Sequence, residues 1–328
     1  MSAPAGEPGR PAGPGWLSAR ILGLGHYQPA RVVTNGDLIA RGVDTTDDWV
    51  RSRVGVRERR FADPDESVVD MAEAAASKAI ANAGLSPDDV DLVITATCTM
   101  PTSVPTAAPQ LATRLGIDSP GAYDVNSGCS GFVYAFNAAA AAVHAGQARH
   151  ALVVASERFS GFIDFDDRAT CVILGDGAGA AVVGPSERAA VGPVTWGSAG
   201  DLHDTVVIEP QTQVFRQEGQ AVYRWATTKM VPVALEACRR AGVAPSELGA
   251  FVPHQANLRI IDMIATKLGI AGGVVARDIV ESGNTSAATI PLAMSKMVER
   301  GEIPSGSPVL LLGFGSGLSF AGQVVTAP

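Results

Sequence analysis

The 328-residue chain lacks the features that mark metal-binding, membrane and secreted proteins. Its four cysteines form no C-x-x-C pair, which disfavours a zinc site, and their wide spacing suggests a reducing compartment. No apolar run reaches the roughly 18 residues that a membrane helix needs. The first fifteen residues contain no apolar stretch like that of a signal peptide, so we expect residues 1–15 to form a disordered tail. These absences predict a cytoplasmic protein without a metal ion.

Basic charge is scarce as well, because 25 lysines and arginines face 33 acidic residues, for a net charge of −8. This balance disfavours general binding to nucleic acid or to an anionic membrane. Hydrophobic residues make up 46% of the chain, which is typical of a globular protein. Because single cores usually split near 300 residues, we expect one large domain or two fused ones.

The chain does contain an internal repeat. Three segments recur in the same order at offsets of 153 to 158 residues: 83–94 with 241–252, 111–117 with 264–270, and 150–157 with 308–315. The repeated unit is predicted to be helix, turn, buried strand, helix and strand, with a helix over 71–83 and a strand over 92–96. This alternation predicts mostly parallel sheets covered by helices. We therefore expect a duplicated α/β/α/β/α sandwich with an N-terminal half over residues 16–188 and a C-terminal half over residues 189–328.

Cys129 is the candidate nucleophile. It follows a glycine and precedes an Ala-rich segment, residues 133–143, that is predicted to be helical. A thiol at a helix N-terminus feels about half a positive charge, which lowers its pKa and favours the reactive thiolate. The ordinary role of a cysteine is to fill space, and we expect that role for Cys98, Cys171 and Cys238.

Two polar residues of the second half are candidate partners of Cys129. His254 ends a predicted buried strand, and ligands bind beyond strand ends in doubly wound sheets. Asn284 lies in the turn that the repeat relates to the Cys129 turn, so we expect it near the pseudo-twofold position of the nucleophile. Its ordinary role would be to cap the following helix.

Two motifs of other enzymes are absent from the sequence. Residues 175–179, Gly-Asp-Gly-Ala-Gly, lack the G-x-G-x-x-G spacing of a dinucleotide loop, which disfavours a dehydrogenase. No G-x-S-x-G motif occurs, which disfavours an α/β-hydrolase. The glycine-rich segment 313–317 instead predicts a bend that brings backbone amides near a ligand.

Taken together, these motifs resemble β-ketoacyl-acyl-carrier-protein synthase III, a family of condensing enzymes in the thiolase superfamily. The likeness spans about residues 19–325 and rests on the cysteine turn and on these blocks: His-Gln-Ala-Asn at 254–257, Gly-Asn-Thr-Ser at 283–286, residues 175–179, and Trp49 with residues 53–59. It implies a thiolase-like duplicated five-layer sandwich, a homodimer and a catalytic triad of Cys129, His254 and Asn284. The chain departs from many members at residues 126–128, where Asn-Ser-Gly replaces alanines, and this bears on the shape of the acyl pocket.

The resemblance implies an acyltransferase that works in two stages. Cys129 takes an acyl group from acyl-CoA, and an enolate formed by decarboxylation of malonyl-acyl carrier protein attacks that group. His254 and Asn284 would donate hydrogen bonds to the malonyl thioester oxygen. The backbone amides of Cys129 and Ser316 would hold the acyl oxygen. Acyl-CoA is then a substrate, and no cofactor is expected.

The resemblance also implies binding residues around this triad. The residues expected to bind CoA and its pantetheine arm are Trp49, Arg53, Arg168 and Asn257, with Trp49 and Arg168 sandwiching the adenine. Those expected to dock the acidic carrier protein are Arg224, Arg259 and Lys267. Those expected to shape the acyl pocket are Val104, Met100 and Phe132. Val104 would reach across the dimer interface and, being small, would leave the partner's pocket open to branched or medium-length primers.

Two other functions share part of this pattern. A starter-unit ketosynthase or acyltransferase of polyketide assembly would keep the triad or part of it. A non-catalytic partner of a ketosynthase need not keep Cys129, His254 and Asn284 together, and this chain has all three.

Overall fold

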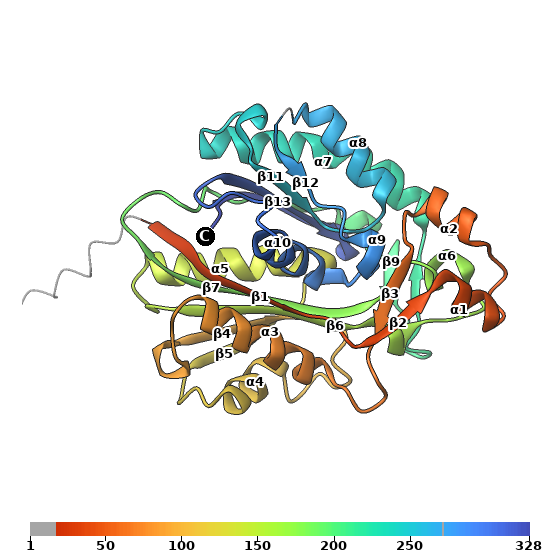
Figure 1. Cartoon of the computed structure of the whole chain (residues 1–328), viewed down its shortest axis with the longest axis horizontal. Coiled ribbons are helices and arrows are strands. Elements are labelled where there is room, and N and C mark those ends of the chain that lie inside the picture. Colours follow the sequence, from red (N-terminus) through yellow and green to blue (C-terminus); the bar gives the residue numbers. More distant parts are fainter. Residues whose placement is uncertain (1–17, 271) are drawn as a thin grey trace, which may run out of the picture.

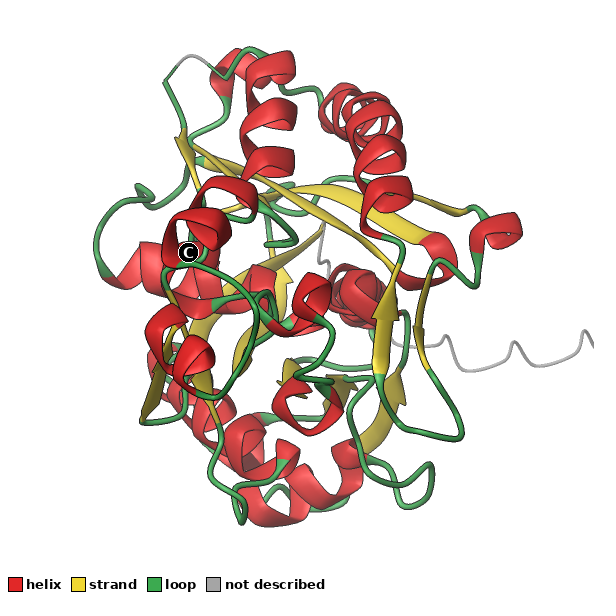
Figure 2. Ribbon diagram, turned by 90° about the vertical axis from the view of Figure 1, so that its right-hand side faces the viewer, coloured by secondary structure: helices red, strands yellow, loops and turns green. Residues whose placement is uncertain are grey.

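The computed structural model describes residues 18–270 and 272–328, and the tail predicted for residues 1–15 lies outside the described residues. Two five-stranded sheets are stacked with helices between them and on both outer faces (Figures 1 and 2). This arrangement confirms the predicted five-layer sandwich. All strands of the first sheet fall within residues 18–186 and all strands of the second within 195–326. The division at residues 188 and 189 stays a prediction.

The two sheets have the same topology. The first has the order β1 (Ser18–Tyr27), β7 (Asp176–Ser186), β6 (Ala151–Arg158), β4 (Leu92–Ala96), β5 (Gly121–Val125). The second, taken in the corresponding direction, has the order β8 (Thr195–Ser198), β14 (Ser319–Thr326), β13 (Pro308–Gly315), β11 (Ala250–Pro253), β12 (Val274–Val275). The predicted strand over 92–96 is confirmed.

Each sheet is mixed, whereas the repeat predicted mostly parallel sheets. In the first sheet β4, β5 and β6 are parallel, but β7 is antiparallel to β6 and to β1. In the second sheet β14 is likewise antiparallel to β13 and β8. The prediction failed because neither β6–β7 nor β13–β14 is joined by a helix long enough for a crossover; the longest helix in either connection is Arg168–Cys171. The chain therefore returns beside the strand it has just left.

Six helices make up the three helical layers. The central pair is α5 (Gly131–His144) and α10 (Thr289–Glu299), which contact both sheets (Figure 1). The outer helices are α3 (Val68–Asn82) and α4 (Ala107–Leu115) on the first sheet, and α7 (Gly219–Ala241) and α8 (Leu258–Leu268) on the second. Central α5 is rich in alanine and phenylalanine and is buried along most of its length, as expected for a helix between two sheets.

Helix α3 begins three residues before its predicted start. The hydroxyl of Ser67 accepts from the Asp70 backbone amide, and the Asp70 carboxylate accepts from the Ser67 amide. This reciprocal cap satisfies two amides that a helix start leaves without partners, so the helix extends through Val68 and Val69. The prediction followed the alanine-rich segment and missed the cap.

Single 3-10 turns repeat together with the larger elements. Turn η1 (Pro87–Asp89) precedes β4 and η5 (Pro245–Glu247) precedes β11, while η2 (Gly128–Ser130) precedes α5 and η6 (Ser286–Ala288) precedes α10. In both pairs the residue offset is 158, which agrees with the strongest repeat in the sequence.

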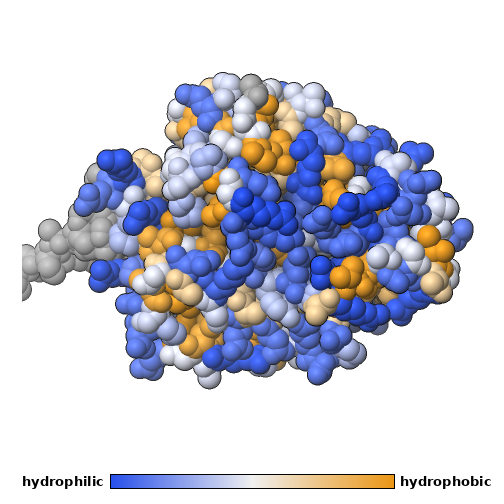
Figure 3. Space-filling model, in the orientation of Figure 1, coloured by the Kyte–Doolittle hydropathy of each residue, from blue (hydrophilic) through white to orange (hydrophobic). Residues whose placement is uncertain are grey.

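Several short elements gather on the right of Figure 1, namely β2 (Arg31–Thr34), α1 (Asn35–Ala40), α2 (Asp47–Arg53), β3 (Glu58–Phe61), α6 (Arg168–Cys171), β9 (Val206–Ile208) and α9 (Ile279–Ser282). The remaining short elements are η3 (Phe159–Phe162), η4 (Gly200–Leu202), β10 (Phe215–Gln217) and η7 (Ser316–Leu318). Residues of several of these elements line the cavities beside Cys129. The surrounding surface is mainly hydrophilic on the face drawn in Figure 3, with hydrophobic residues in separate patches. Within the described residues, no helix is long and apolar enough to cross a membrane.

Candidate active site

Cys129 lies in η2, directly before α5, so its predicted place at a helix N-terminus is confirmed. Gly128 reaches this turn with φ +49°, and a Cβ at Gly128 would lie 2.8 Å from the Ser316 Cβ. A Cβ at Gly315 would lie 2.9 Å from the Cys129 sulfur. The bend at Gly315 and Ser316 therefore packs directly on the cysteine, and both contacts require glycine for steric reasons.

The pKa of the Cys129 thiol is raised to about 11, so the predicted decrease was wrong. Burial is the largest cause, because the charged thiolate loses water. A hydrogen bond from the Ser286 hydroxyl (Oγ to Sγ, 3.5 Å) and the backbone amides of Ser316 and Cys129 oppose this increase. These two amides are the predicted oxyanion donors, and both are directed at the Cys129 sulfur. Their role toward an acyl oxygen stays a prediction.

His254 comes directly after β11, at the carboxyl end of that strand. Its ring is 2% exposed, and its Nδ1 lies 2.8 Å from the Thr289 hydroxyl oxygen. The ring also meets Phe314 edge to face, with the centroids 5.4 Å apart. Burial lowers the pKa of His254 to about 3, against an opposing effect of the Ser286 backbone, so the imidazole is neutral at pH 7.

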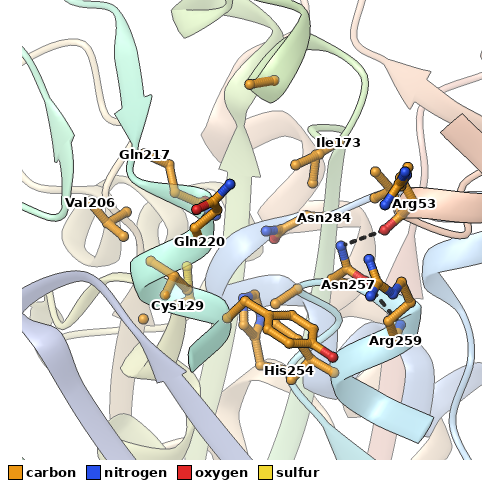
Figure 4. A pocket seen from close by; sticks show the side chains of 18 of the residues that line it. Arg53, Cys129, Ile173, Val206, Gln217, Gln220, His254, Asn257, Arg259 and Asn284 are labelled. Atoms are coloured by element: carbon orange, nitrogen blue, oxygen red, sulfur yellow. Dashed lines mark hydrogen bonds between the residues drawn. The ribbon is translucent and has the colours of Figure 1, made fainter. Parts of the chain in front are cut away.

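Asn284 is held by its own turn. Its backbone amide donates to Ile173 O (2.8 Å), and its Oδ1 accepts from the Ser286 amide (2.8 Å). Because the side-chain oxygen is used in this way, the Nδ2 group is the part available to a ligand. Figure 4 shows the amide directed into the space between Cys129 and His254.

The three predicted triad residues line a single cavity of about 700 Å³ (Figure 4). Cys129, His254 and Asn284 are all buried and come from separate turns of the two halves. Exposed or half-buried residues of the same cavity include five predicted binding residues, namely Trp49, Arg53, Arg224, Asn257 and Arg259. The cavity therefore connects a buried thiol to a surface that carries several cations.

Trp49 and Arg168 already contact each other. The guanidinium carbon of Arg168 lies 5.2 Å from the centre of the Trp49 ring, and Arg168 also donates to Asp44 O (3.0 Å). An adenine ring placed between the two would need roughly 7 Å, twice the ~3.5 Å distance of a van der Waals contact. The predicted sandwich thus requires Arg168 or Trp49 to move away.

Asn257 has two structural contacts as well as a place in the cavity. Its Oδ1 caps α8 by accepting from the Arg259 amide (2.9 Å), and its Nδ2 donates to Arg53 O (3.1 Å), as Figure 4 shows. One N–H of the amide remains for the predicted contact with pantetheine.

The docking residues differ in their placement. Arg224 and Arg259 are exposed and line the large cavity, and the Arg259 guanidinium lies 5.3 Å from the centre of the Tyr223 ring. Lys267 is exposed but lies outside the cavity lining, and its ammonium group donates to Thr227 O (3.1 Å).

A second cavity of about 230 Å³ also borders Cys129 and is the candidate acyl pocket. Met100 lines it, as predicted, together with Phe159, Phe162 and Phe215. Phe132 lies elsewhere, packed against Phe136 in the core between the sheets, and its predicted place in the pocket is corrected.

Two further predictions concern the acyl pocket. Val104 is 82% exposed and lines neither cavity of its own chain, so its role toward a partner subunit stays a prediction. Cys98 lies just after β4 and lines the second cavity beside Cys129, whereas the sequence predicted only a space-filling role for it.

Sequence reasoning missed a buried polar group next to Cys98. The Glu157 carboxylate accepts from the Thr99 hydroxyl (2.6 Å) and from the Cys98 amide (3.1 Å). Burial raises the pKa of Glu157, against these hydrogen bonds. Ser286 links this group to the nucleophile, since its hydroxyl lies 3.6 Å from the Cys98 sulfur and 3.5 Å from the Cys129 sulfur. The repeat contained a signal for Ser286, because its turn η6 matches η2.

The structure shows that the repeat relates Cys129 to a different residue of the second half than the sequence analysis expected. Turns η2 and η6 are related by an offset of 158, and their first residues, Gly128 and Ser286, have φ of +49° and +50°. At this offset the mate of Cys129 is Ala287, and Asn284 is the mate of Asn126. The expected place of Asn284 at the pseudo-twofold mate of the nucleophile is therefore corrected by three residues. Asn284 still reaches the cavity of Cys129 because η2 and η6 contact each other.

No group of three or more His, Cys, Asp or Glu residues able to hold a metal ion occurs in residues 18–270 and 272–328. The groups around the large cavity include the Cys129 thiol, the His254 imidazole, the Asn284 amide and backbone donors. Such groups are suited to nucleophilic attack on a thioester and to stabilisation of an oxyanion.

Comparisons with known proteins agree with this geometry. Residues 123–200 match the family model described as 3-oxoacyl-[acyl-carrier-protein (ACP)] synthase III, and residues 238–327 match the model of its C-terminal region. A relative from Streptomyces coelicolor, beta-ketoacyl-[acyl-carrier-protein] synthase III 4, is 55% identical over 94% of this chain and 99% of its own length.

Solved structures give the same result. The priming beta-ketosynthase of the R1128 polyketide biosynthetic pathway has a TM-score of 0.93 and 41% identity, over 98% of this chain and 99% of that chain. The 3-oxoacyl-[acyl-carrier-protein] synthase III from Aquifex aeolicus has a TM-score of 0.90 and 37% identity, over 94% and 99% of the two chains. With its fold, its buried thiol and these relatives in agreement, the chain belongs to the 3-oxoacyl-[acyl-carrier-protein] synthase III family.

Proposed function

We propose that the chain joins the acyl group of an acyl-CoA to the two-carbon unit of a malonyl-acyl carrier protein, using Cys129, His254 and Asn284. One observation carries the assignment of these residues: all three line the buried part of a cavity whose exposed residues include Arg53 and Arg259. Coenzyme A and an acidic carrier protein are both anionic, and each presents its thioester on a long pantetheine arm. A buried thiol reached past surface cations suits both.

In the first stage Cys129 attacks the thioester carbon of acyl-CoA. The Cys129 S–C bond forms, the CoA sulfur leaves, and the acyl group is held on the enzyme. The backbone amides of Cys129 and Ser316 stabilise the oxygen that becomes negative in the tetrahedral intermediate. Support for this role is that both amides already lower the pKa of the sulfur they surround.

In the second stage the malonyl group loses CO₂ and its thioester becomes an enolate. The negative charge develops on the thioester oxygen, where His254 and the Nδ2 group of Asn284 donate hydrogen bonds. The enolate carbon attacks the acyl carbon, a C–C bond forms, and Cys129 leaves as the 3-oxoacyl product is released. One preorganised donor of this kind is worth about 3–4 kcal/mol.

The acyl group itself fits the second cavity. Its volume of about 230 Å³ and its aromatic lining suit a small or medium-length primer. Polar residues, among them Asn126, Gln213 and Ser286, also line it.

The protein is also proposed to act as a homodimer. Strand β5 is an edge strand of the first sheet and carries Tyr123, which is 42% exposed. Val104 is 82% exposed, which suits a residue that is covered by, and reaches into, a second subunit. Light scattering that gave the mass of a monomer, near 33.7 kDa, would refute this part of the proposal.

A second function, priming of a polyketide assembly line, uses the same chemistry with a different carrier protein. The likeness to the R1128 priming ketosynthase favours it. A competition experiment distinguishes the two functions: malonyl-loaded carrier proteins of fatty-acid and of polyketide synthesis are offered together to the same acyl-enzyme, and the preferred carrier protein is identified.

The test of the proposed function follows both stages by mass spectrometry. The purified enzyme is mixed with acetyl-, isobutyryl- or hexanoyl-CoA, the acylated residue is mapped, and malonyl-acyl carrier protein is then added. Cys129→Ala should lose both the acyl adduct and the 3-oxoacyl product, while the control Cys238→Ala, in helix α7, keeps both. A 3-oxoacyl product formed by Cys129→Ala at the wild-type rate would reject the proposal.

A further inference from the structure

His254 contacts a short chain of hydrogen bonds that the proposed reaction does not use. Its Nδ1 lies 2.8 Å from the hydroxyl oxygen of Thr289, the first residue of α10. The same hydroxyl lies 2.8 Å from Ser286 O. All three groups are buried.

The hydrogen atoms of this chain can be assigned by counting donors. Two oxygens 2.8 Å apart repel each other unless a hydrogen lies between them, and a carbonyl oxygen only accepts. The hydroxyl of Thr289 therefore donates its one hydrogen to Ser286 O. The hydrogen in the gap between Thr289 and His254 must then come from Nδ1 of the ring.

We propose that Thr289 is a positioning residue that keeps the proton of neutral His254 on Nδ1, so that Nε2 carries a lone pair. The tautomer is inferred from the hydrogen-bond geometry alone. Its catalytic consequence rests on the proposed function. The contacts fit neutral His254 with Nδ1–H and also the imidazolium, which keeps that hydrogen. They do not fit the neutral ring with its proton on Nε2.

This tautomer gives His254 two successive roles. In the free enzyme Nε2 can only accept, so it takes the proton of the Cys129 thiol as the sulfur attacks acyl-CoA. The departing CoA sulfur then takes this proton from Nε2. When the malonyl group enters, its carboxylate supplies the negative charge that favours an imidazolium, and Nε2 takes a proton from solvent. Nε2–H can then donate to the malonyl thioester oxygen. When Cys129 leaves in the final step, it recovers this proton, and each turnover ends with the thiol and the neutral ring.

The environment of both residues favours this starting state. Burial disfavours the thiolate and the imidazolium separately, so the resting pair is neutral. A transient ion pair between them carries no net charge, which reduces the cost of forming it in a buried site. The tautomer set by Thr289 decides whether this transfer can start.

The first test reads the tautomer directly in the free enzyme and needs no substrate. The chain has five histidines, so ¹⁵N-histidine labelling gives a short list of ring signals, and the loss of one set in His254→Gln assigns His254. At pH 7 the expected result is a protonated Nδ1 and an unprotonated Nε2. A protonated Nε2 on the neutral ring overturns the inference, whatever the activity of the enzyme.

The second test removes the hydroxyl. Thr289→Val has nearly the same shape but removes the hydroxyl that accepts from Nδ1, whereas Thr289→Ser keeps a hydroxyl at this position. Forcing the wrong tautomer in a Ser-His-Asp triad lowers kcat about 10⁴-fold. Thr289→Val frees the ring without forcing it, so we expect a loss of roughly 10- to 100-fold in the rate of Cys129 acylation, with little change in KM for acyl-CoA. Thr289→Ser should restore most of the rate.

The same helix offers a matched control. The hydroxyl of Ser295, also on α10, lies 2.9 Å from Nδ1 of His26, outside both cavities beside Cys129. Ser295→Ala removes a comparable hydroxyl–imidazole contact and should leave acylation unchanged. Equal losses in Ser295→Ala and Thr289→Val would mean that α10 has merely been disturbed, and this would refute a specific role of Thr289.

Failure of the inference and failure of the proposed function give different results. If wild-type enzyme does not acylate Cys129, the proposed function fails while the tautomer can still be read. If the wild type acylates and condenses but Thr289→Val acylates equally fast, the positioning role is wrong and the function stands. If Thr289→Val does not fold, the ring signals of the wild type and the rate of Thr289→Ser decide.

Discussion

Replacing Gly315 by alanine tests how tightly the nucleophile is held. The added Cβ would lie 2.6 Å from the Cys129 Cβ and 2.9 Å from its sulfur, whereas ordinary contacts begin near 3.4 Å. Gly315 has φ 168°, which is extended and accessible to alanine, so the cost is steric. The cysteine side chain must move by about 0.8 Å or the bend at Ser316 must open. Either change separates the sulfur from its amide donors.

The expected effects follow from this displacement. A misplacement of about 1 Å at a reacting atom can cost roughly 100-fold in rate, which is about 2.7 kcal/mol of activation free energy. Overpacking a core typically costs about 1–3 kcal/mol of the free energy of unfolding. Gly315→Ala should therefore fold with reduced stability and acylate Cys129 about 100 times more slowly.

Gly131, two residues after Cys129, provides the matched control. A Cβ there would meet the Cβ atoms of Ala96 and Ala287 at 3.4 and 3.5 Å, which are ordinary contacts, and the helix gains about 0.5–1 kcal/mol from the exchange. Acylation is followed by quenched-flow mass spectrometry and stability by thermal unfolding. If Gly315→Ala acylates at the rate of the wild type, or if both variants slow equally, the steric reasoning is refuted.

Three further changes test other parts of the molecule. Asn284→Ala should lose condensation at least 100-fold while Cys129 is still acylated, because it removes one oxyanion donor of about 3 kcal/mol; both stages are read by mass spectrometry. Arg259→Glu should raise KM for malonyl-acyl carrier protein more than KM for acyl-CoA, and the difference should shrink with added salt, since exposed charges are screened over about 8 Å at physiological ionic strength. Burial raises the pKa of Asp176 to about 6 from 3.8, so the folded state binds more protons than the unfolded state between these values. The free energy of unfolding should therefore fall by about 2 kcal/mol as the pH rises from 4 to 6. Asp176→Asn should flatten this slope in chemical denaturation.

Each of these predictions has a contrary outcome. Asn284→Ala that condenses at the wild-type rate would remove the amide from the mechanism. An effect of Arg259→Glu that is equal for both substrates and independent of salt would mean that the carrier protein binds elsewhere. The control is Arg239→Glu, because Arg239 is an exposed arginine of α7 that pairs with Glu236. If the free energy of unfolding changes with pH in the same way in wild type and in Asp176→Asn, Asp176 is not the source of the pH dependence.

The sequence was sufficient for the fold because the repeat is visible without any structure. The offset of 158 that relates residues 83–94 to 241–252 is the same offset that relates η1 to η5 and η2 to η6. Buried apolar segments such as Leu92–Ala96 predicted their strands directly. The antiparallel strands β7 and β14 were missed because periodicity reports burial but not strand direction.

The sequence indicated which residues form the candidate site but not their burial or their hydrogen-bond partners. Cys129, His254 and Asn284 follow strand ends and turns that the sequence locates. The pKa of Cys129 could not be predicted, because helix position is local whereas burial depends on the packing of Gly315 and Ser316 from the other half. The contact of Thr289 with His254 joins residues 35 positions apart and carries no local signal.

The matched topology of the two sheets means that the fold provides two equivalent places for chemistry, and the described residues use one. At the offset of 158, His254 corresponds to Ala96, and Gly315, which leaves room beside Cys129, corresponds to Glu157. The glutamate side chain occupies that second place and ties down its surrounding loop with hydrogen bonds. Under the proposed mechanism the two halves depend on each other, because the N-terminal half supplies the nucleophile Cys129 and the C-terminal half supplies His254 and Asn284.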